Sequence, residues 1–186
     1  MDPYGSHIKI LEFVVDKFNI KMVLETGLGK FSTSLFINKC DEVISLEMQD
    51  SKWYDIISNK FNGSINFHPN LLLGPFSACK FIKNIDKKFD LIFVDGHWES
   101  RWMQINVSFS KTDLIIAHDS EVKSYNWHKV IFPDNFVWID VMNYIPWTAV
   151  ICKKDSIYYD EILKNFNTKL KKRFNLIKIE KKFNLL

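Results

Sequence analysis

The chain has 186 residues and a formal net charge of +3, with 47% hydrophobic and 25% charged residues. This length predicts roughly one domain with one buried core, and the composition is that of a globular chain and not a disordered one. No apolar run approaches the roughly 18 residues that a membrane span needs, and the first residues lack the character of a signal peptide. We therefore expect a cytoplasmic protein with no membrane partner.

The three cysteines, Cys40, Cys79 and Cys152, form no Cys-x-x-Cys pair, which predicts reduced thiols and neither a disulfide framework nor a zinc-thiolate site. Much of the basic excess lies after Lys164. A basic tail either contacts nucleic acid or is a solvated face. We favour the solvated face, so nucleic acid is not expected as a partner. An oligomer is compatible with the sequence.

The segment 22–34, MVLETGLGKFSTS, predicts the first strand, turn and helix of a nucleotide-binding α/β domain. Gly27 and Gly29 permit a sharp turn close to a ligand because neither carries a Cβ. Ser32 and Thr33 follow where a helix N-terminus offers free N–H groups and hydroxyl caps. The third glycine of a dinucleotide fingerprint is missing, which disfavours an NAD-dependent oxidoreductase.

Short apolar runs alternate along the chain with segments of helical periodicity. Strands are expected at 22–25, 43–47, 65–68, 90–95, 113–118, 136–142 and 148–153, and helices at 8–18, 51–61, 76–85 and 100–109. Most of the runs are continuous, as in strands buried on both faces of a parallel sheet. The fold class is therefore expected to be α/β, a doubly wound Rossmann-like sheet of seven mostly parallel strands.

The last two strands break this rhythm, because the five residues between them are too few for a helical crossover. They predict a C-terminal antiparallel hairpin, which common NAD-binding folds lack. Residues 1–155 are expected to form this domain together with an N-terminal helix. Residues 156–186 are expected to add a C-terminal helix and a basic appendage to the same domain.

Polar residues at the ends of the second and third strands are candidates for binding a nucleoside. The Glu47 carboxylate offers two oxygens to the hydroxyls of a ribose, and the alternative is that it caps the following helix. Met48 would then cover one face of the adenine. Asn70 is a candidate for the adenine amine, or it forms a turn through its own backbone.

The fourth strand ends in Asp95-Gly96-His97 and the fifth in His118-Asp119. Because the pKa of histidine lies near neutrality, either ring can take a proton from a hydroxyl group. A lone histidine at a strand end is more often structural, but two His-Asp pairs at neighbouring ends predict that at least one acts in the site. The catalytic candidates are His97, His118 and Asp119.

The residues before the first helix leave two interpretations open. Tyr4 and His7 would fold over the cofactor or the substrate, or this leader would serve only to start the helix. Ser6 suffices as the N-terminal cap in the second case.

Together, the ETGLG turn, VDGH and AHDSE resemble the class I S-adenosylmethionine (SAM)-dependent methyltransferases, and in particular the small O-methyltransferases, over roughly residues 8–153. The resemblance implies O-methyl transfer to a small hydroxyl-bearing acceptor. It implies that SAM is held by Glu25, Gly27, Gly29, Ser32, Glu47, Met48, Asn70 and Asp95. The alternatives are a non-catalytic nucleoside-binding subunit with this fold and, less favoured, an NAD-dependent oxidoreductase.

Some members of this family hold a divalent metal with acidic residues at the fourth and fifth strand ends. Asp95 and Asp119 are the matching positions here, so Mg²⁺ or Mn²⁺ is a candidate cofactor. Ser120 departs from the pattern, since the catechol-type enzymes carry an asparagine ligand there. The absence of an Asp/Asn-Pro-Pro-aromatic segment argues against methylation of amines on DNA bases.

Overall fold

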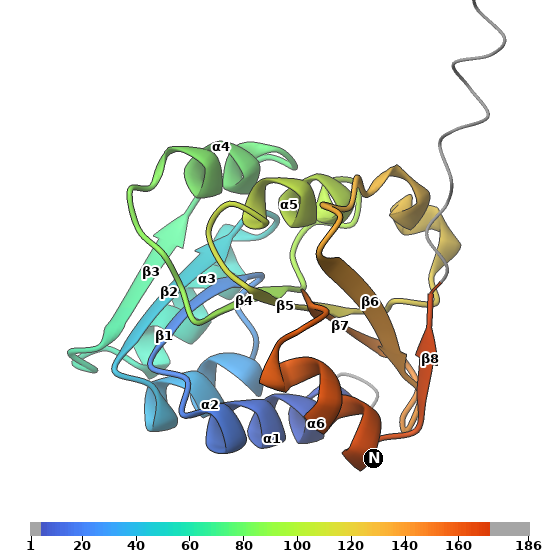
Figure 1. Ribbon diagram of the computed structural model, residues 1–186. Coiled ribbons are helices and arrows are strands. Elements are labelled where there is room, and N and C mark those ends of the chain that lie inside the picture. Colours follow the sequence, from blue (N-terminus) through green and yellow to red (C-terminus); the bar gives the residue numbers. More distant parts are fainter. Residues whose placement is uncertain (1–4, 172–186) are drawn as a thin grey trace, which may run out of the picture.

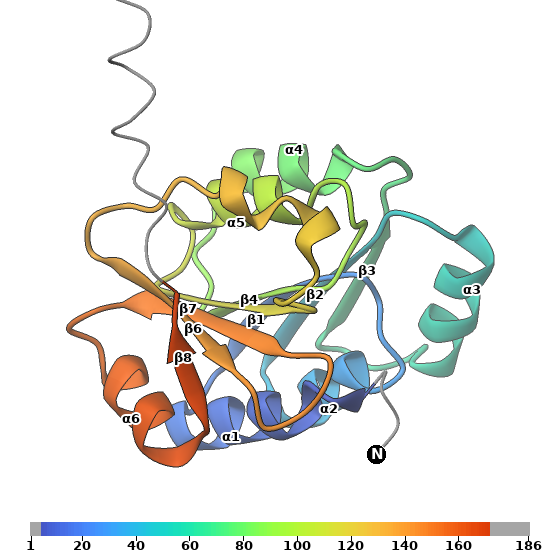
Figure 2. The ribbon, with the colours of Figure 1, turned by 90° about the vertical axis from the view of Figure 1, so that its right-hand side faces the viewer.

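The computed structural model describes residues 5–171, and in this part of the chain an eight-stranded sheet lies between two layers of helices (Figures 1 and 2). The strands, in their order across the sheet, are β3 (Phe67–Leu71), β2 (Glu42–Glu47), β1 (Met22–Thr26), β4 (Leu91–Val94), β5 (Leu114–His118), β7 (Thr148–Lys153), β6 (Phe136–Val141) and β8 (Thr168–Leu170). The first five are parallel, whereas β7 pairs antiparallel with both β5 and β6. The predicted doubly wound sheet with an antiparallel hairpin is confirmed.

One face of the sheet is covered by α1 (Ile8–Phe18), α2 (Ser32–Lys39), α3 (Ser51–Lys60) and α6 (Ile157–Asn165). The other face is covered by α4 (Ser77–Asn84), α5 (Arg101–Ser108) and two short 3-10 turns, Lys123–Tyr125 and Trp127–Lys129. In β4, Leu91 and Phe93 pack into the first core, and Ile92 and Val94 into the second. This alternation explains why the strand reads as a continuous apolar run.

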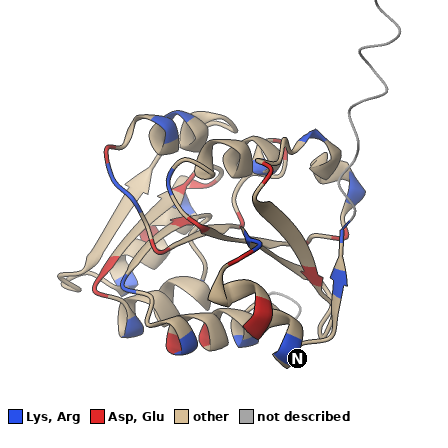
Figure 3. Ribbon diagram, viewed as in Figure 1, with Lys and Arg blue, Asp and Glu red and all other residues tan. Residues whose placement is uncertain are grey.

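Charged residues of both signs are interspersed over the helices (Figure 3). Lys39 of α2 pairs with Asp16 of α1, and Lys17 of α1 pairs with Glu161 of α6. Within residues 5–171, no helix is long and apolar enough to cross a membrane. The basic residues at 172–186 and Tyr4 lie outside the described residues.

Two elements differ from the sequence prediction. β3 spans Phe67–Leu71 instead of 65–68, because Ile65 is 95% exposed and precedes the pairing with β2. Asn70 therefore lies inside the strand. β8 was not expected, since a three-residue edge strand with exposed polar residues carries no hydrophobic pattern. It extends the sheet by pairing antiparallel with β6.

The register of the parallel strands brings the candidate residues together. Thr26 pairs with Val94, and Val94 pairs with Ala117. The residues that follow these three, Gly27, Asp95 and His118, therefore lie beside one another at the carboxyl edge of the sheet. Ligands of doubly wound sheets bind at this edge.

Candidate functional site

The turn after β1 lies directly against the turn after β4. Gly27 adopts φ +88°, and a Cβ at this position would lie 2.6 Å from the carbonyl oxygen of Asp95. The Gly27 amide donates to the carbonyl of Leu46 at 2.7 Å, which ties the turn to β2 as well. Only glycine fits this conformation and this spacing without displacing the backbone.

Glu25 lies buried beneath this turn. Its Oε2 accepts hydrogen bonds from Thr33 Oγ1 at 2.6 Å and from Ser45 Oγ at 2.7 Å, and Ser45 is its register partner on β2. Its Oε1 is buried and has no hydrogen-bond partner among the described residues. Burial raises the pKa of Glu25 to about 7, against the hydroxyl bonds, which lower it. Glu25 thus supports the turn from below and carries one unpaired polar atom.

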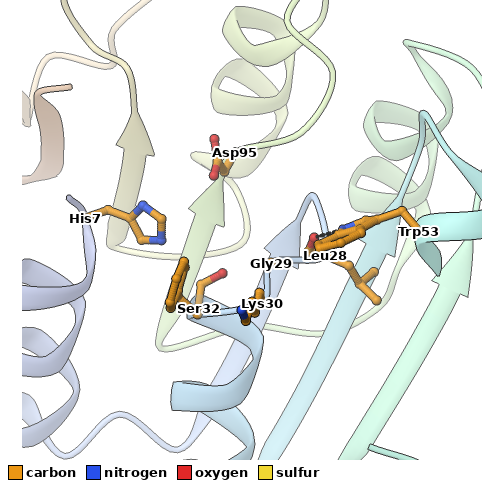
Figure 4. Close-up of a pocket in the computed structure, with 8 residues that line it drawn as sticks. His7, Leu28, Gly29, Lys30, Ser32, Trp53 and Asp95 are labelled. Atoms are coloured by element: carbon orange, nitrogen blue, oxygen red, sulfur yellow. Dashed lines mark hydrogen bonds between the residues drawn. The ribbon is translucent and has the colours of Figure 1, made fainter. Parts of the chain in front are cut away.

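Two adjoining cavities of about 290 and 410 Å³ open over the carboxyl ends of β1, β2 and β4. They share Leu28, Gly29, Trp53 and Asp95 as lining residues, so they form one cleft. The smaller cavity reaches Glu47, and the larger reaches His7 and Ser32. Figure 4 shows the larger cavity, with His7 and Asp95 on one side and Trp53 on the other.

The Glu47 carboxylate caps the turn that follows β2 and not α3, whose N-cap is Asp50, and its binding of a ribose stays a prediction. Its Oε1 accepts hydrogen bonds from the amides of Met48, Gln49 and Asp50, at 2.9, 2.7 and 3.2 Å, and so caps the turn. No hydrogen bond from the described residues reaches Oε2, although Glu47 lines the smaller cavity. One carboxylate oxygen is therefore held rigidly, and the other is available to a ligand.

Trp53 forms a wall of the cleft that the sequence did not reveal. Its indole Nε1 donates to the carbonyl of Leu28 at 2.7 Å, which fixes the ring beside the glycine turn. Trp53 is at the third position of α3, where an aromatic residue reads equally well as core packing.

Met48 and Asn70 do not line the two cavities. Met48 is buried in the core under Gly96, where Gln104 Nε2 approaches its sulfur at 3.7 Å. Asn70 Nδ2 donates to the carbonyl of His68 at 2.9 Å, so its side chain bonds to its own strand. Ser32 does line the larger cavity, at the first position of α2.

Arg101, at the start of α5, lies between Asp95 and Asp119. Its Nη2 lies 2.9 Å from Asp95 Oδ1, and its Nη1 lies 2.9 Å from Asp119 Oδ2. Desolvation acts to raise the pKa of Asp95, but the charge of Arg101 and the contact with His118 outweigh it and lower that pKa overall. The sequence alone gives Arg101 no role, because its partners are set by the register of β4 and β5.

His118 has a polar partner at each of its ring nitrogens. Its Nε2 lies 2.8 Å from Ser6 Oγ, whose own proton goes to the carbonyl of Pro146 at 3.1 Å. Ser6 is therefore the acceptor, and it does not cap α1, whose N-cap residue is His7. His118 Nδ1 lies 3.4 Å from Asp95 Oδ1 and 3.6 Å from Asp119 Oδ1. Burial disfavours the charged ring, but these two carboxylates raise the pKa of His118 overall.

His7 is only 3% exposed, and neither of its ring nitrogens has a hydrogen-bond partner among the described residues. Its ring lies edge-on to that of His118, with centroids 4.5 Å apart, and lines the larger cavity. Burial lowers the pKa of His7 to about 4, with the charges of His118 and Arg101 acting in the same direction and Asp95 opposing them. The ring is therefore neutral at physiological pH and available to a ligand.

His97 lies apart from this group, although the sequence placed it beside Asp95. Its Nδ1 accepts a hydrogen bond from the Glu99 amide at 3.3 Å, and its ring stacks on Trp98. It does not line either cavity of the cleft. The structure thus brings together Asp95, His118 and Asp119, adds His7 and Arg101, and leaves His97 outside.

No protein-family description matches this chain, and a search of curated proteins finds no match. Solved methyltransferase structures are nevertheless similar to it. An O-methyltransferase of Bacillus cereus in complex with S-adenosylhomocysteine (SAH) has a TM-score of 0.63 and 15% identity, covering 78% of this chain and 80% of that one.

Two further structures have the same fold. An O-methyltransferase of Streptomyces achromogenes involved in tomaymycin synthesis, in complex with SAM, has a TM-score of 0.63 and 8% identity, over 81% of this chain and 87% of that one. An rRNA methylase of Streptococcus thermophilus has a TM-score of 0.56 and 11% identity, over 78% and 95%. At these identities the similarity shows the fold of the class I methyltransferases, and function has to be argued from the site.

Proposed function

We propose that this protein is a SAM-dependent methyltransferase that transfers the methyl group to the oxygen of a small hydroxyl-bearing acceptor. The observation that carries the proposal is the cleft that runs from Glu47, past the Gly27 turn, to the ring of His7, whose nitrogens have no hydrogen-bond partner among the described residues. The similarity to folds crystallised with SAM and SAH supports it.

The residues of the cleft fit the two ends of this cofactor. Glu47 Oε2 would accept a hydrogen bond from a ribose hydroxyl, and its Oε1 stays with the turn amides. The Gly27–Gly29 turn and Ser32 would lie along the amino-acid end, since the missing Cβ of Gly27 lets the backbone approach closely. The orphaned Oε1 of Glu25 lies beneath the same turn. When bound, SAM supplies an electrophilic methyl group on a positively charged sulfur.

His7 is the residue we propose as the proton acceptor. As a neutral imidazole with both nitrogens free, it would take the proton from the acceptor hydroxyl at one ring nitrogen. A weak base is sufficient here, because an oxygen becomes strongly acidic while it is being methylated. His118 is less suited to this task, because its contacts with Ser6, Asp95 and Asp119 favour its protonated form. We propose that His118 and Asp119 instead position the residues around the site.

The test is SAH formation from SAM in the presence of panels of phenols, sugars and hydroxy acids. For any acceptor that supports turnover, His7→Asn is expected to lower the rate about 100-fold or more, as loss of a general base does. SAH affinity should stay close to that of the wild type. His128→Asn, which changes an exposed histidine, is the matched control. Full turnover by His7→Asn would contradict the role of His7. Binding of SAM with no turnover on any acceptor would favour the non-catalytic subunit.

A further inference from the structure

Metal-dependent members of the O-methyltransferase family would place a divalent cation between the residues that correspond to Asp95 and Asp119. In this structure the guanidinium of Arg101 lies at that position, with one nitrogen 2.9 Å from each carboxylate. The side chain is buried and comes from the first residue of α5, directly after the Asp95 turn. The residues present therefore do not fit a metal between the two carboxylates.

The guanidinium is held on several sides by its surroundings. Three backbone carbonyls accept its N–H groups: Gly96 from Nε at 2.8 Å, His118 from Nη1 at 3.1 Å and Asp95 from Nη2 at 3.2 Å. With the bond from Nη1 to Asp119 Oδ2, these make four hydrogen bonds, and Nη2 is also ion-paired with Asp95 Oδ1. The ring of Tyr125 lies 4.6 Å from the centre of the guanidinium, in a cation–π contact. A metal ion would have to displace a group that is held by four hydrogen bonds and two ion pairs.

The same arrangement bears on a second candidate metal site. Ligand atoms of His7, Asp95 and His118 lie within 4.8 Å of one another. However, Asp95 Oδ1 already contacts Arg101 and His118, and His118 Nε2 bonds to Ser6. Of the three side chains, only His7 has neither a hydrogen bond nor an ion pair among the described residues. One free imidazole does not make a metal site.

We infer that Arg101 is the resident cation of this site and takes the place of a divalent metal between Asp95 and Asp119. The guanidinium compensates the carboxylates and fixes the ends of β4 and β5 through hydrogen bonds to residues that follow both strands. Arg101 is thus a positioning residue and does not itself bind the acceptor. The inference deepens the proposed function, on which its catalytic meaning rests, because it leaves His7 as the group that faces the reacting hydroxyl.

Metal binding tests this inference without any turnover. Mn²⁺ binding is followed by the loss of the free-ion signal in electron paramagnetic resonance, and Co²⁺ binding by its visible absorption. The wild type is expected to show no saturable binding up to about 1 mM, which covers even weak protein sites for hard cations. Arg101→Met keeps an unbranched apolar side chain but removes the charge, so it should gain saturable Mn²⁺ binding. Asp119→Asn in the Arg101→Met background should abolish that gain.

Three controls make the outcome decisive. Arg101→Lys keeps one positive charge and should gain no Mn²⁺ site, and Lys87→Met removes an ion-paired cation elsewhere, beside Glu42, and should also gain none. Circular dichroism and SAH affinity report whether Arg101→Met folds. If Arg101→Met does not fold, the titrations of the wild type and of Arg101→Lys still test the inference.

Saturable Mn²⁺ binding by the wild type that Asp119→Asn removes, or Co²⁺ binding that His7→Phe removes, would overturn the inference. So would a folded Arg101→Met that binds no Mn²⁺. None of these results bears on SAH binding by the wild type, so the proposed function is tested separately.

Discussion

His7 and His118 lie edge to face with their ring centroids 4.5 Å apart, yet only His118 has hydrogen-bond partners among the described residues. The two rings come from segments that are distant in sequence, one just before α1 and the other at the end of β5. The contrast has an electrostatic consequence. The carboxylates of Asp95 and Asp119 raise the pKa of His118, whereas burial lowers the pKa of His7 to about 4. The carboxylates thus favour the protonated form of His118, whereas burial favours the neutral form of His7.

This contrast predicts a pH dependence of stability that belongs to His7. Its pKa is about 4 in the folded protein and 6.5 as the reference value. Between these values the unfolded chain binds a proton that the folded chain does not, so the free energy of unfolding falls as pH decreases from 6.5 to 4. The loss is about 3 kcal/mol by linkage. In chemical denaturation between pH 4 and 6.5, His7→Phe should lack this contribution to the pH dependence of the free energy of unfolding. His128→Phe, at an exposed site, should keep the pH dependence of the wild type. A His7→Phe variant with the pH dependence of the wild type would refute the assignment.

Glu25 predicts the opposite slope in a neighbouring pH window. Burial raises its pKa from 4.5 to about 7, so the folded protein holds a proton that the unfolded chain has lost. Stability therefore falls as pH rises from 4.5 to 7, by about 3 kcal/mol. Glu25→Gln removes this loss, so the free energy of unfolding of the variant relative to wild type should rise through the window. Glu99→Gln, at an exposed carboxylate, is the control and should show no such rise.

The glycine turn predicts a difference between two substitutions with similar backbone strain. Gly27 and Gly63 have φ of +88° and +93°, but a Cβ at Gly27 would meet the Asp95 backbone, whereas nothing lies within 4 Å of one at Gly63. Gly63→Ala should lower the free energy of unfolding by about 1 to 2 kcal/mol, the strain of an alanine in this region. Gly27→Ala should lower it by about 3 kcal/mol or more. Equal losses in thermal or urea unfolding would mean that the two turns are not in contact.

Glu47 predicts a loss of cofactor affinity without a loss of fold. Glu47→Gln keeps an oxygen for the amides of Met48, Gln49 and Asp50 but removes the charge that would face the ribose. SAH affinity should fall by about 1.5 to 3 kcal/mol, which is the range for hydrogen bonds to a charged group. Glu42→Gln, at the opposite end of the same strand, should leave the affinity unchanged. Equal affinities for all three proteins would place the ribose elsewhere.

The sequence predicts the parallel strands, the antiparallel hairpin and the polar residues at the ends of β4 and β5. Buried strands such as β4 and β5 are continuous apolar runs, and parallel strands end at one edge, so Asp95 and His118 were correctly expected to be neighbours. The glycine turn was also expected. The physical reason for glycine there is that a Cβ on Gly27 would lie 2.6 Å from the carbonyl oxygen of Asp95. This is a contact between two strand ends that the local sequence does not indicate.

The rest of the site depends on where side chains point in space, which the position of a residue in the sequence does not indicate. His7 is distant in sequence from β5, so the sequence leaves open whether the segment before α1 returns to the sheet edge or only starts the helix. Arg101 differs from an ordinary helix-start residue only in that five acceptors surround it. His97 adjoins Asp95 in the chain, but the turn directs its ring toward Trp98. β8 is too short and too polar to carry a period-two signal.

The central claim, that the cleft between Glu47 and His7 binds SAM, is tested most directly by isothermal titration calorimetry of the wild type with SAM, SAH and NAD. We expect saturable 1:1 binding of SAM and SAH and none of NAD. A melting temperature that rises with SAH is also expected, since ligand at about one hundred times its dissociation constant stabilises the fold by about 2.7 kcal/mol. Binding of NAD without binding of the adenosyl compounds, or binding of none of the three, would contradict the account.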